Sequence, residues 1–357
     1  MNRSVSAPGK LFLSGEYAVL WGGAALLAAV GPRMAGWVKS RSDGEVHLVT
    51  GAGRLRGRTT PLGVNWAGPV PAPFLFAARG VDEALRAHGA EALGFELVLA
   101  PPEPTAGGGK LGMGGSAQAA VLAVELSRFA LQSSFEPLKV ALLAHAKAQV
   151  GAGSGGDVAA VSAGGIVRYR RYPLENLAKA SALGQLPAAL SGAPPVDLRC
   201  LPTTQVRLSY AYSGKSASTP AVIAEVEQRL SAGDRERIRT ESDQLGRALE
   251  ESMLRSDFRS LAEAVSGLQR LLSSIGTLET EAIGRILGLA RSYGAAAKIS
   301  GAGRGDGCVL FSPDAETERE LLDGIRSRGF WATPLAIEPG MRGEAEIDPR
   351  LREMAER

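Results

Sequence analysis

A glycine-rich stretch at 107–115 is the strongest chemical signal in the sequence. It reads Gly-Gly-Gly-Lys-Leu-Gly-Met-Gly-Gly and leads through Ser116 into a run with helical periodicity. Glycines let backbone N–H groups approach a phosphate closely, and a helix start adds unpaired donors and the positive end of the helix dipole. Ser116 can cap the helix or offer its hydroxyl to Mg²⁺. The pattern favours phosphate binding over the alternative, an ordinary surface loop before a capped helix.

Two well-known nucleotide-binding patterns do not fit this stretch. A P-loop closes with Gly-Lys-Ser or Gly-Lys-Thr, and no such ending follows here. A Rossmann fingerprint needs an acidic residue at the end of a second strand about 20 residues further on, and that residue is missing. A dinucleotide-dependent oxidoreductase is therefore disfavoured.

Three further segments carry residues suited to phosphate chemistry. Lys10 follows Ala-Pro-Gly in an apolar stretch, where it either snorkels to the surface or is held as a fixed positive charge. Asp157 follows Gly-Ser-Gly-Gly at the start of a helical run, as an N-cap or as a carboxylate with a chemical role. Residues 300–307 join two apolar strands, as a hairpin turn or as backbone packed against a ligand. For each segment taken alone, the structural interpretation (a snorkelling lysine, an N-cap or a hairpin turn) is at least as good as a role in phosphate chemistry.

Composition and charge narrow the function classes. The 357 residues are 45% hydrophobic and 22% charged, which suits a globular enzyme of two domains or one large one. The net charge of +3 comes without a long basic run, so we expect no nucleic-acid partner. No apolar run approaches the roughly 20 residues that span a bilayer, and the first residues are not typical of a signal peptide. We expect a cytoplasmic protein in which Cys200 and Cys308 are reduced core residues.

The residue pattern changes between the first and second parts of the chain, and the mixture of expected strands and helices predicts an α+β fold. Short β-like runs rich in glycine and proline reach to about residue 175, and long charged amphipathic stretches begin near residue 205. The loosely patterned 173–204 is the expected domain junction. Expected strands cover 4–6 and 11–13 (separated by a turn at 7–10), 95–99, 205–212, 295–298, 308–311 and 331–337. Expected helices cover 116–132, 136–150, 158–163, 221–231, 234–254, 257–273, 278–293 and 314–328. Because strands and helices alternate without a regular βαβ period, a doubly wound sheet is disfavoured.

In their order along the chain, these segments resemble the GHMP kinases, a family that includes galactokinase, homoserine kinase, mevalonate kinase and phosphomevalonate kinase. The resemblance runs over roughly residues 5 to 312. It rests on Lys10 in the first strand, the glycine loop before a helix, the Ser-Gly-x-Asp that ends at Asp157, and the late Gly-Ala-Gly-x-Gly.

Two positions depart from the pattern of that family. Its signature Gly-Leu-Gly-Ser-Ser-Ala stands here as Gly-Met-Gly-Gly-Ser-Ala at 112–117, so that Gly115 replaces the first serine and Ser116 keeps the second. Mevalonate kinases place a magnesium-binding glutamate about eleven residues before the catalytic aspartate, where this chain has Ala146. The neighbouring His145 and Gln149 are poorer Mg²⁺ ligands than a carboxylate, and the three histidines of the chain form no catalytic pattern.

Several motifs are most similar to those of phosphomevalonate kinases. They are Gly-Glu-Tyr-Ala-Val at 15–19, Gly-Ser-Gly-Gly-Asp-Val-Ala at 153–159, Ser-Gly-Lys-Ser-Ala-Ser-Thr at 213–219, Gly-Ala-Gly-Arg-Gly-Asp at 301–306, and Lys110. A phosphomonoester is largely dianionic at neutral pH and needs no base, but two polyanions must then meet in one site. At about 4 Å and an effective dielectric constant near 20, each like-charge pair costs about 4 kcal/mol. The positive charge to offset it would come from Lys10, Lys110, Lys147 and Lys215.

The resemblance implies a two-domain α+β GHMP kinase fold, divided into 1–190 and 191–357, with the active site in the cleft between the domains. It implies ATP and Mg²⁺, a small anionic substrate, and a monomer or homodimer. The implied reaction is phosphoryl transfer to (R)-5-phosphomevalonate. Mevalonate kinase is the alternative, and a catalytically silent GHMP-fold metabolite sensor is a more distant one.

The resemblance also implies roles for individual residues. Lys10 and Asp157 are the expected catalytic pair, with Asp157 chiefly orienting Lys10, and Ser116 is the expected metal ligand. Expected ATP-binding residues are Lys110, Gly112, Met113, Gly114, Gly115, Ser116, Ala117, Gly301, Ala302 and Gly303. Expected substrate-binding residues are Lys10, Ser14, Glu16, Tyr17, Ser154, Gly155, Ser213, Lys215, Ser216, Ser218, Thr219, Gly305 and Asp306.

Overall fold

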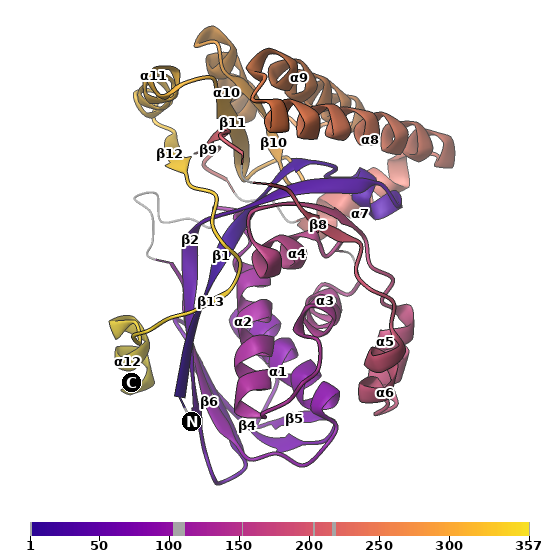
Figure 1. Ribbon diagram of the computed structural model, residues 1–357, viewed down its shortest axis with the longest axis vertical. Helices are drawn as coiled ribbons and strands as arrows, with labels where there is room; N and C mark the ends of the chain where they lie inside the picture. Colours follow the sequence, from indigo (N-terminus) through magenta and orange to yellow (C-terminus); the bar gives the residue numbers. More distant parts are fainter. Residues whose placement is uncertain (1, 103–110, 152, 203, 216–218, 357) are drawn as a thin grey trace.

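The computed structural model describes residues 2–102, 111–151, 153–202, 204–215 and 219–356. Its elements form two units, each a sheet covered by helices, that meet along the first strand (Figure 1). The larger sheet has the order β13-β1-β2-β6-β3-β4-β5, with β7 paired to β2 and β8 paired to β7. Its strands are β1 Asn2–Ser14, β2 Ala24–Ser40, β3 Glu45–Thr50, β4 Gly53–Thr60, β5 Gly63–Trp66, β6 Phe95–Ala100, β7 Ile166–Arg170, β8 Leu198–Cys200 and β13 Arg342–Gly343.

Helices cover one face of the larger sheet (Figure 1). They are α1 Leu75–His88, α2 Gly115–Ala130, α3 Pro137–Ala148, α4 Gly156–Ala163, α5 Glu175–Ala182 and α6 Leu186–Gly192, with the short 3₁₀ helix η2 Ala72–Phe74. A second short 3₁₀ helix, η1 Ala18–Trp21, follows β1 and packs against the second unit instead. The core between sheet and helices is aliphatic, and Leu27, Leu97 and Val121 are almost fully buried in it. Burial of this apolar face supplies the main driving force for the layer.

The second unit is a four-stranded antiparallel sheet in the order β10-β11-β9-β12. Its strands are β9 Arg207–Tyr212, β10 Ala296–Ser300, β11 Gly307–Ser312 and β12 Trp331–Leu335, and its helices are α7 Thr219–Arg229, α8 Ala232–Arg255, α9 Phe258–Ile275, α10 Glu281–Ser292 and α11 Ala315–Arg326. Helix α8 begins with a capping box in which Ser231 and Asp234 satisfy each other's backbone donors. The two sheets and their helices confirm the α+β expectation.

The chain then returns to the larger sheet. Strand β13 pairs with β1, and helix α12, Pro349–Glu356, lies on the face opposite α2 (Figure 1). Leu351 is fully buried there in a small cluster with Ala35 and Val98. Strand β8 and these last elements join the first sheet although they follow residue 190, and the division into 1–190 and 191–357 stays a prediction.

Two local expectations were wrong. Strand β1 is continuous, because a register shift between Ala7 and Gly9 accommodates Pro8, which has no N–H to donate. The segment 173–204 contains α5, α6 and β8, and its role as the domain junction stays a prediction. Cys200 is exposed on β8, whereas Cys308 is buried as expected. Among the described residues, no helix combines the length and apolar character needed to cross a membrane.

Candidate active site

Lys10 and Asp157 face each other across two elements of the first unit. Lys10 lies on β1 and is 7% exposed, and its Nζ is 3.6 Å from Oδ2 of Asp157. Its alkyl stem runs over Gly114, where a Cβ would lie 2.9 Å from Lys10 Cγ. The backbone N–H of Lys10 donates to the carbonyl of Met113 at 2.9 Å. Lys10 therefore does not snorkel to the surface; it is a fixed positive charge beside the glycine turn.

Asp157 lies in the first turn of α4, two residues after the N-cap, which is Gly155. Burial raises the pKa of Asp157, but the positive charge of Lys10 and the nearby His145 hold that pKa below its ordinary value. The carboxyl group is therefore ionised at neutral pH. A carboxylate with a lowered pKa is a weak base, so its arrangement suits orienting Lys10 better than removing a proton.

The glycine turn opens helix α2, whose first-turn amides have no acceptor among the residues that the structure describes. Gly112 and Gly114 adopt φ of 71° and 91°, which glycine reaches without strain, and Gly114 is the N-cap. The first-turn amides of Gly115, Ser116 and Ala117 have no acceptor within the helix, and an anion can satisfy them. A Cβ at Gly115 would meet nothing within 4 Å, so the position usually held by serine is open space.

The late glycine turn at 301–306 lies directly against the first one. A Cβ on Gly112 would fall 2.4 Å from Cγ of Asp306, so the Asp306 side chain packs on the backbone of Gly112. Tyr210 ties the two units together at the same place, because its hydroxyl donates to the carbonyl of Leu111 at 2.7 Å. Burial raises the pKa of Tyr210 well above its ordinary value, which keeps that donor protonated. The two turns thus form one surface where the units meet.

The turn itself requires unusual backbone. Gly301 and Gly303 have φ of 103° and 79°, and Arg304 and Asp306 also adopt positive φ. Ala302 and Gly305 are buried within it. Such strained backbone persists where the surroundings hold it, and it gathers at functional sites.

The loop after β9 is fastened to the same turn. The N–H of Ser213 donates to the carbonyl of Asp306 at 2.7 Å, and the N–H of Asp306 donates to the carbonyl of Lys215 at 2.6 Å. Lys215 is exposed, and Thr219 begins α7 in a partly buried position. Ser216 and Ser218, like Lys110 of the glycine loop, lie outside the described residues. The structure therefore brings Ser213 and Lys215 beside Asp306, and contact of either residue with substrate stays a prediction.

Ser154 and Gly155 form the turn that precedes Asp157. The hydroxyl of Ser154 accepts from the N–H of Gly156 at 3.2 Å, and its carbonyl accepts from the hydroxyl of Tyr169 at 3.0 Å. Gly155 has φ of 82°, and a Cβ there would lie 2.8 Å from that hydroxyl. Tyr169 therefore fixes the turn that carries Asp157 into the site.

Glu16 and Tyr17 are engaged at the boundary between the units rather than at the glycine turns. Glu16 forms a buried ion pair with Lys298, and neither side chain is more than 2% exposed. The hydroxyl of Tyr17 donates to the carbonyl of Ala302 at 2.5 Å, and burial raises the pKa of Tyr17. Tyr17 thus contacts the 301–306 turn and Glu16 contacts the strand β10 that leads into it, and a direct contact with substrate stays a prediction for each.

Two other expected residues have neighbours of their own. Ser14 is 2% exposed, and a Cβ on Gly246 of α8 would lie 3.0 Å from its Oγ. Lys147, expected to contribute positive charge, donates to Oε1 of Glu83 and to Oγ of Ser181, both at 2.7 Å. Lys147 therefore links α3 to α1 and α5.

His145 is the residue of this site that sequence reasoning missed. It is 2% exposed, its Nε2 is 3.3 Å from Oγ of Ser116, and its ring lies 5.0 Å from that of Phe76. Burial lowers the pKa of His145, although the charge of Asp157 acts in the opposite direction. The one signal in the sequence was that His145 precedes Ala146, the residue at the position where mevalonate kinases have the magnesium-binding glutamate.

The donor set fits a Mg²⁺ ion that arrives with a nucleotide. In the described part of the chain, no three His, Cys, Asp or Glu side chains gather as a metal-binding group. Mg²⁺ usually keeps several waters and is shared between few protein ligands and substrate phosphates. The Ser116 hydroxyl at the first turn of α2 would supply one such ligand and the nucleotide phosphates the others.

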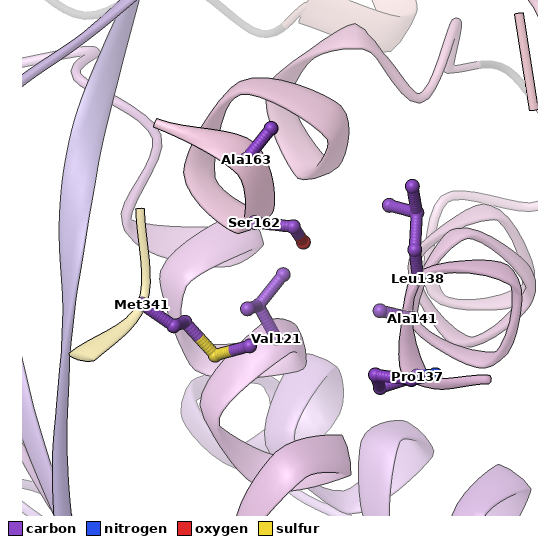
Figure 2. Close-up of a pocket in the computed structure, with 7 residues that line it drawn as sticks. All are labelled: Val121, Pro137, Leu138, Ala141, Ser162, Ala163 and Met341. Carbon is purple, nitrogen blue, oxygen red and sulfur yellow. The ribbon is translucent and has the colours of Figure 1, made fainter. Parts of the chain in front are cut away.

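A separate cavity of about 220 Å³ lies between α2, α3 and α4, close to Met341 (Figure 2). Val121, Leu138 and Ala141 give it an apolar lining, and Ser162 is the one polar side chain among its lining residues. Because it offers no charge, it is unsuited to phosphates.

Comparison with known proteins agrees with this geometry. Residues 249–329 match the family model described as GHMP kinases C terminal. The chain is 30% identical over 349 residues to mevalonate kinase of Aeropyrum pernix, covering 95% of this chain and 97% of that protein. It is 28% identical over 398 residues to phosphomevalonate kinase of a Streptomyces species, covering 94% and 97%. The structure of Streptococcus pneumoniae phosphomevalonate kinase with phosphomevalonate and AMPPNP superposes with a TM-score of 0.77 at 18% identity, covering 93% and 99%. The chain belongs to the GHMP kinase family.

Proposed function

We propose that the protein transfers the terminal phosphoryl group of ATP to (R)-5-phosphomevalonate, giving 5-diphosphomevalonate and ADP. The observation that carries this proposal is the Lys10–Asp157 pair at 3.6 Å, held against the glycine turn that opens helix α2. Helix-start amides bind phosphate, and a buried lysine beside them supplies a positive charge where charge shifts during transfer.

In this proposal, each part of the site has one task. The amides of 112–117 hold the phosphates of ATP, and the turn at 301–303 packs against them. Lys10 neutralises charge on the transferred phosphoryl group, and Asp157 keeps Lys10 in place. Ser116 would be the protein ligand of Mg²⁺ bound with ATP, and the ion would supply positive charge that offsets the charge of the phosphates. Ser154, Ser213 and Lys215 hold the acceptor, with Asp306 fixing the backbone of that loop.

Electrostatics favour a phosphorylated acceptor over a free alcohol. A mevalonate hydroxyl loses a proton as it attacks, so it profits from a base, and the lowered pKa makes Asp157 a weak one. A phosphomonoester is already largely dianionic at pH 7 and needs positive charge instead. Lys10, and Lys215 in the loop fastened to Asp306, would supply it. The solved relative that binds phosphomevalonate and AMPPNP supports the same assignment.

Mevalonate is the second candidate acceptor, because the relative with 30% identity is a mevalonate kinase. In that case Asp157 would act as the general base despite its lowered pKa. We further propose a division into functional halves at 1–190 and 191–357, and a cytoplasmic monomer or homodimer.

A coupled ADP-release assay with ATP and Mg²⁺ separates the candidates. We expect turnover with (R)-5-phosphomevalonate and at most trace turnover with (R)-mevalonate at matched concentration. Turnover with mevalonate alone would keep the family and reverse the acceptor. If neither acceptor gives ADP release and the protein still binds ATP, the result would favour a metabolite sensor.

A further inference from the structure

The imidazole of His145, on α3, lies against the first turn of α2, where the glycine turn leads into the helix. Its position is fixed from two directions. The ring of Phe76 lies 5.0 Å away, centroid to centroid, and Lys147, two residues further along α3, donates to Oε1 of Glu83 at 2.7 Å. An imidazole held in this way offers its Nε2 atom to Ser116 Oγ at 3.3 Å.

The hydroxyl of Ser116 needs a partner that sets its direction. Ser116 is the second residue of α2, and the cap position belongs to Gly114, so its hydroxyl is not used for capping. A serine hydroxyl has one hydrogen to donate and two lone pairs with which to accept. If the hydrogen points to His145 Nε2, both lone pairs are left for a cation on the opposite side.

We propose that His145 is a positioning residue for the Mg²⁺–nucleotide complex. Its Nε2 accepts the hydrogen bond from Ser116 Oγ and thereby turns the lone pairs of that oxygen toward the metal. The inference rests on the proposed function, because it takes Ser116 as a metal ligand. It explains how a site with Ala146 in place of a carboxylate keeps its one hydroxyl ligand oriented.

A purely structural role makes a different prediction. A buried imidazole also stabilises a fold through its packing against Phe76, and its loss would then lower stability without touching metal dependence. If His145 acts through Ser116, its removal weakens nucleotide binding with Mg²⁺ and leaves binding without Mg²⁺ unchanged. Removing His145 after Ser116 would then cost nothing more, because the two side chains act as one unit.

The test is calorimetric titration with AMPPNP, in excess Mg²⁺ and in EDTA. The variants are His145→Leu, His145→Gln, Ser116→Ala and the double variant Ser116→Ala/His145→Leu, with His88→Gln on α1 as the matched control. A hydrogen bond of this kind is worth a three- to ten-fold change in affinity, to order of magnitude. We expect His145→Leu to lose that much with Mg²⁺ and nothing in EDTA. Gln, whose amide oxygen can accept from Ser116, should restore most of it.

The double variant decides the matter. We expect its affinity with Mg²⁺ to equal that of Ser116→Ala. Additive losses, or equal losses with and without Mg²⁺, would overturn the inference. If His145→Leu does not fold, as judged by circular dichroism, the comparison of His145→Gln with wild type decides: a Mg²⁺-independent loss in that variant also overturns it. Failure of the proposed function shows separately, as absence of ADP release in wild-type protein that binds the Mg²⁺–nucleotide normally.

Discussion

Replacing Lys10 by methionine removes its positive charge and keeps an unbranched side chain over Gly114. The charge is close to the proposed reaction path, since Nζ is 3.6 Å from Asp157 Oδ2 beside the α2 amides. At that separation and an effective dielectric constant near 20, two unit charges interact with about 5 kcal/mol. Loss of an interaction of about 4 kcal/mol that acts on the transition state lowers kcat about a thousand-fold.

The same change has a smaller effect on the folded state. It leaves Asp157 without its counter-ion, but the side chain of Asp157 is 23% exposed and water screens part of the loss. We therefore expect the free energy of unfolding to fall by about 1–2 kcal/mol, less than for breaking a fully buried ion pair. The variant should fold and should bind the nucleotide.

Steady-state kinetics with (R)-5-phosphomevalonate and titration with AMPPNP measure the two quantities separately. We expect kcat of Lys10→Met to fall about a thousand-fold, and nucleotide affinity by less than about ten-fold. Lys39→Met, at an exposed position of β2, is the matched control and should behave as wild type. Equal losses in kcat and affinity, or no loss in either, would refute the role assigned to Lys10.

Three further changes test other parts of the site. Gly115→Ser should preserve the fold and gain up to about 0.5 kcal/mol in stability, because a Cβ there meets nothing within 4 Å and serine suits a helix better than glycine; a lower melting temperature would contradict this. Gly112→Ala should cost about 1–3 kcal/mol more in denaturant unfolding than Gly329→Ala, since both have positive φ but only the first forces Asp306 aside; equal costs would deny the contact between the two turns. For Asp157→Asn, we compare the free energy of unfolding of wild type with that of the variant as a function of pH. Because the folded-state pKa of Asp157 is lowered, the stability that its carboxylate adds is complete above the ordinary carboxyl pKa of about 4. That added stability is lost as pH falls through the folded-state pKa. Added stability that persists or grows on acidification would show that the carboxylate is not stabilised by its surroundings.

Periodicity predicted the helices of the second unit well, because their apolar positions recur every three or four residues and their caps are local. In α9, for example, Leu261, Val265, Leu268 and Leu272 are buried on one face, and Asp257 caps the helix start. Strand β1 was misjudged at Pro8, because whether a proline ends a strand depends on the neighbouring strand and its register. The return of β13 to β1 was missed for a similar reason, since pairing of residues so far apart leaves no local signal.

In the active site too, short motifs could be recognised in the sequence, whereas contacts between separate helices could not. The resemblance to GHMP kinases implied that Lys10, the glycine turn, Asp157 and Asp306 would gather, and the structure brings them together. The pairing of Ser116 with His145 depends on how α3 packs beside α2, and no spacing within either helix reports it. From the sequence, Lys147 was expected to contribute positive charge to the site. In the structure it instead donates a hydrogen bond to Glu83 of α1.

Phosphorus NMR of the products formed from ATP, Mg²⁺ and (R)-5-phosphomevalonate is the most direct test of transfer onto a phosphate. We expect the phosphomonoester resonance to be replaced by two coupled pyrophosphate resonances, with ADP formed in equal amount. An unchanged phosphomonoester resonance, in a preparation that converts mevalonate to its phosphate, would contradict the proposed reaction.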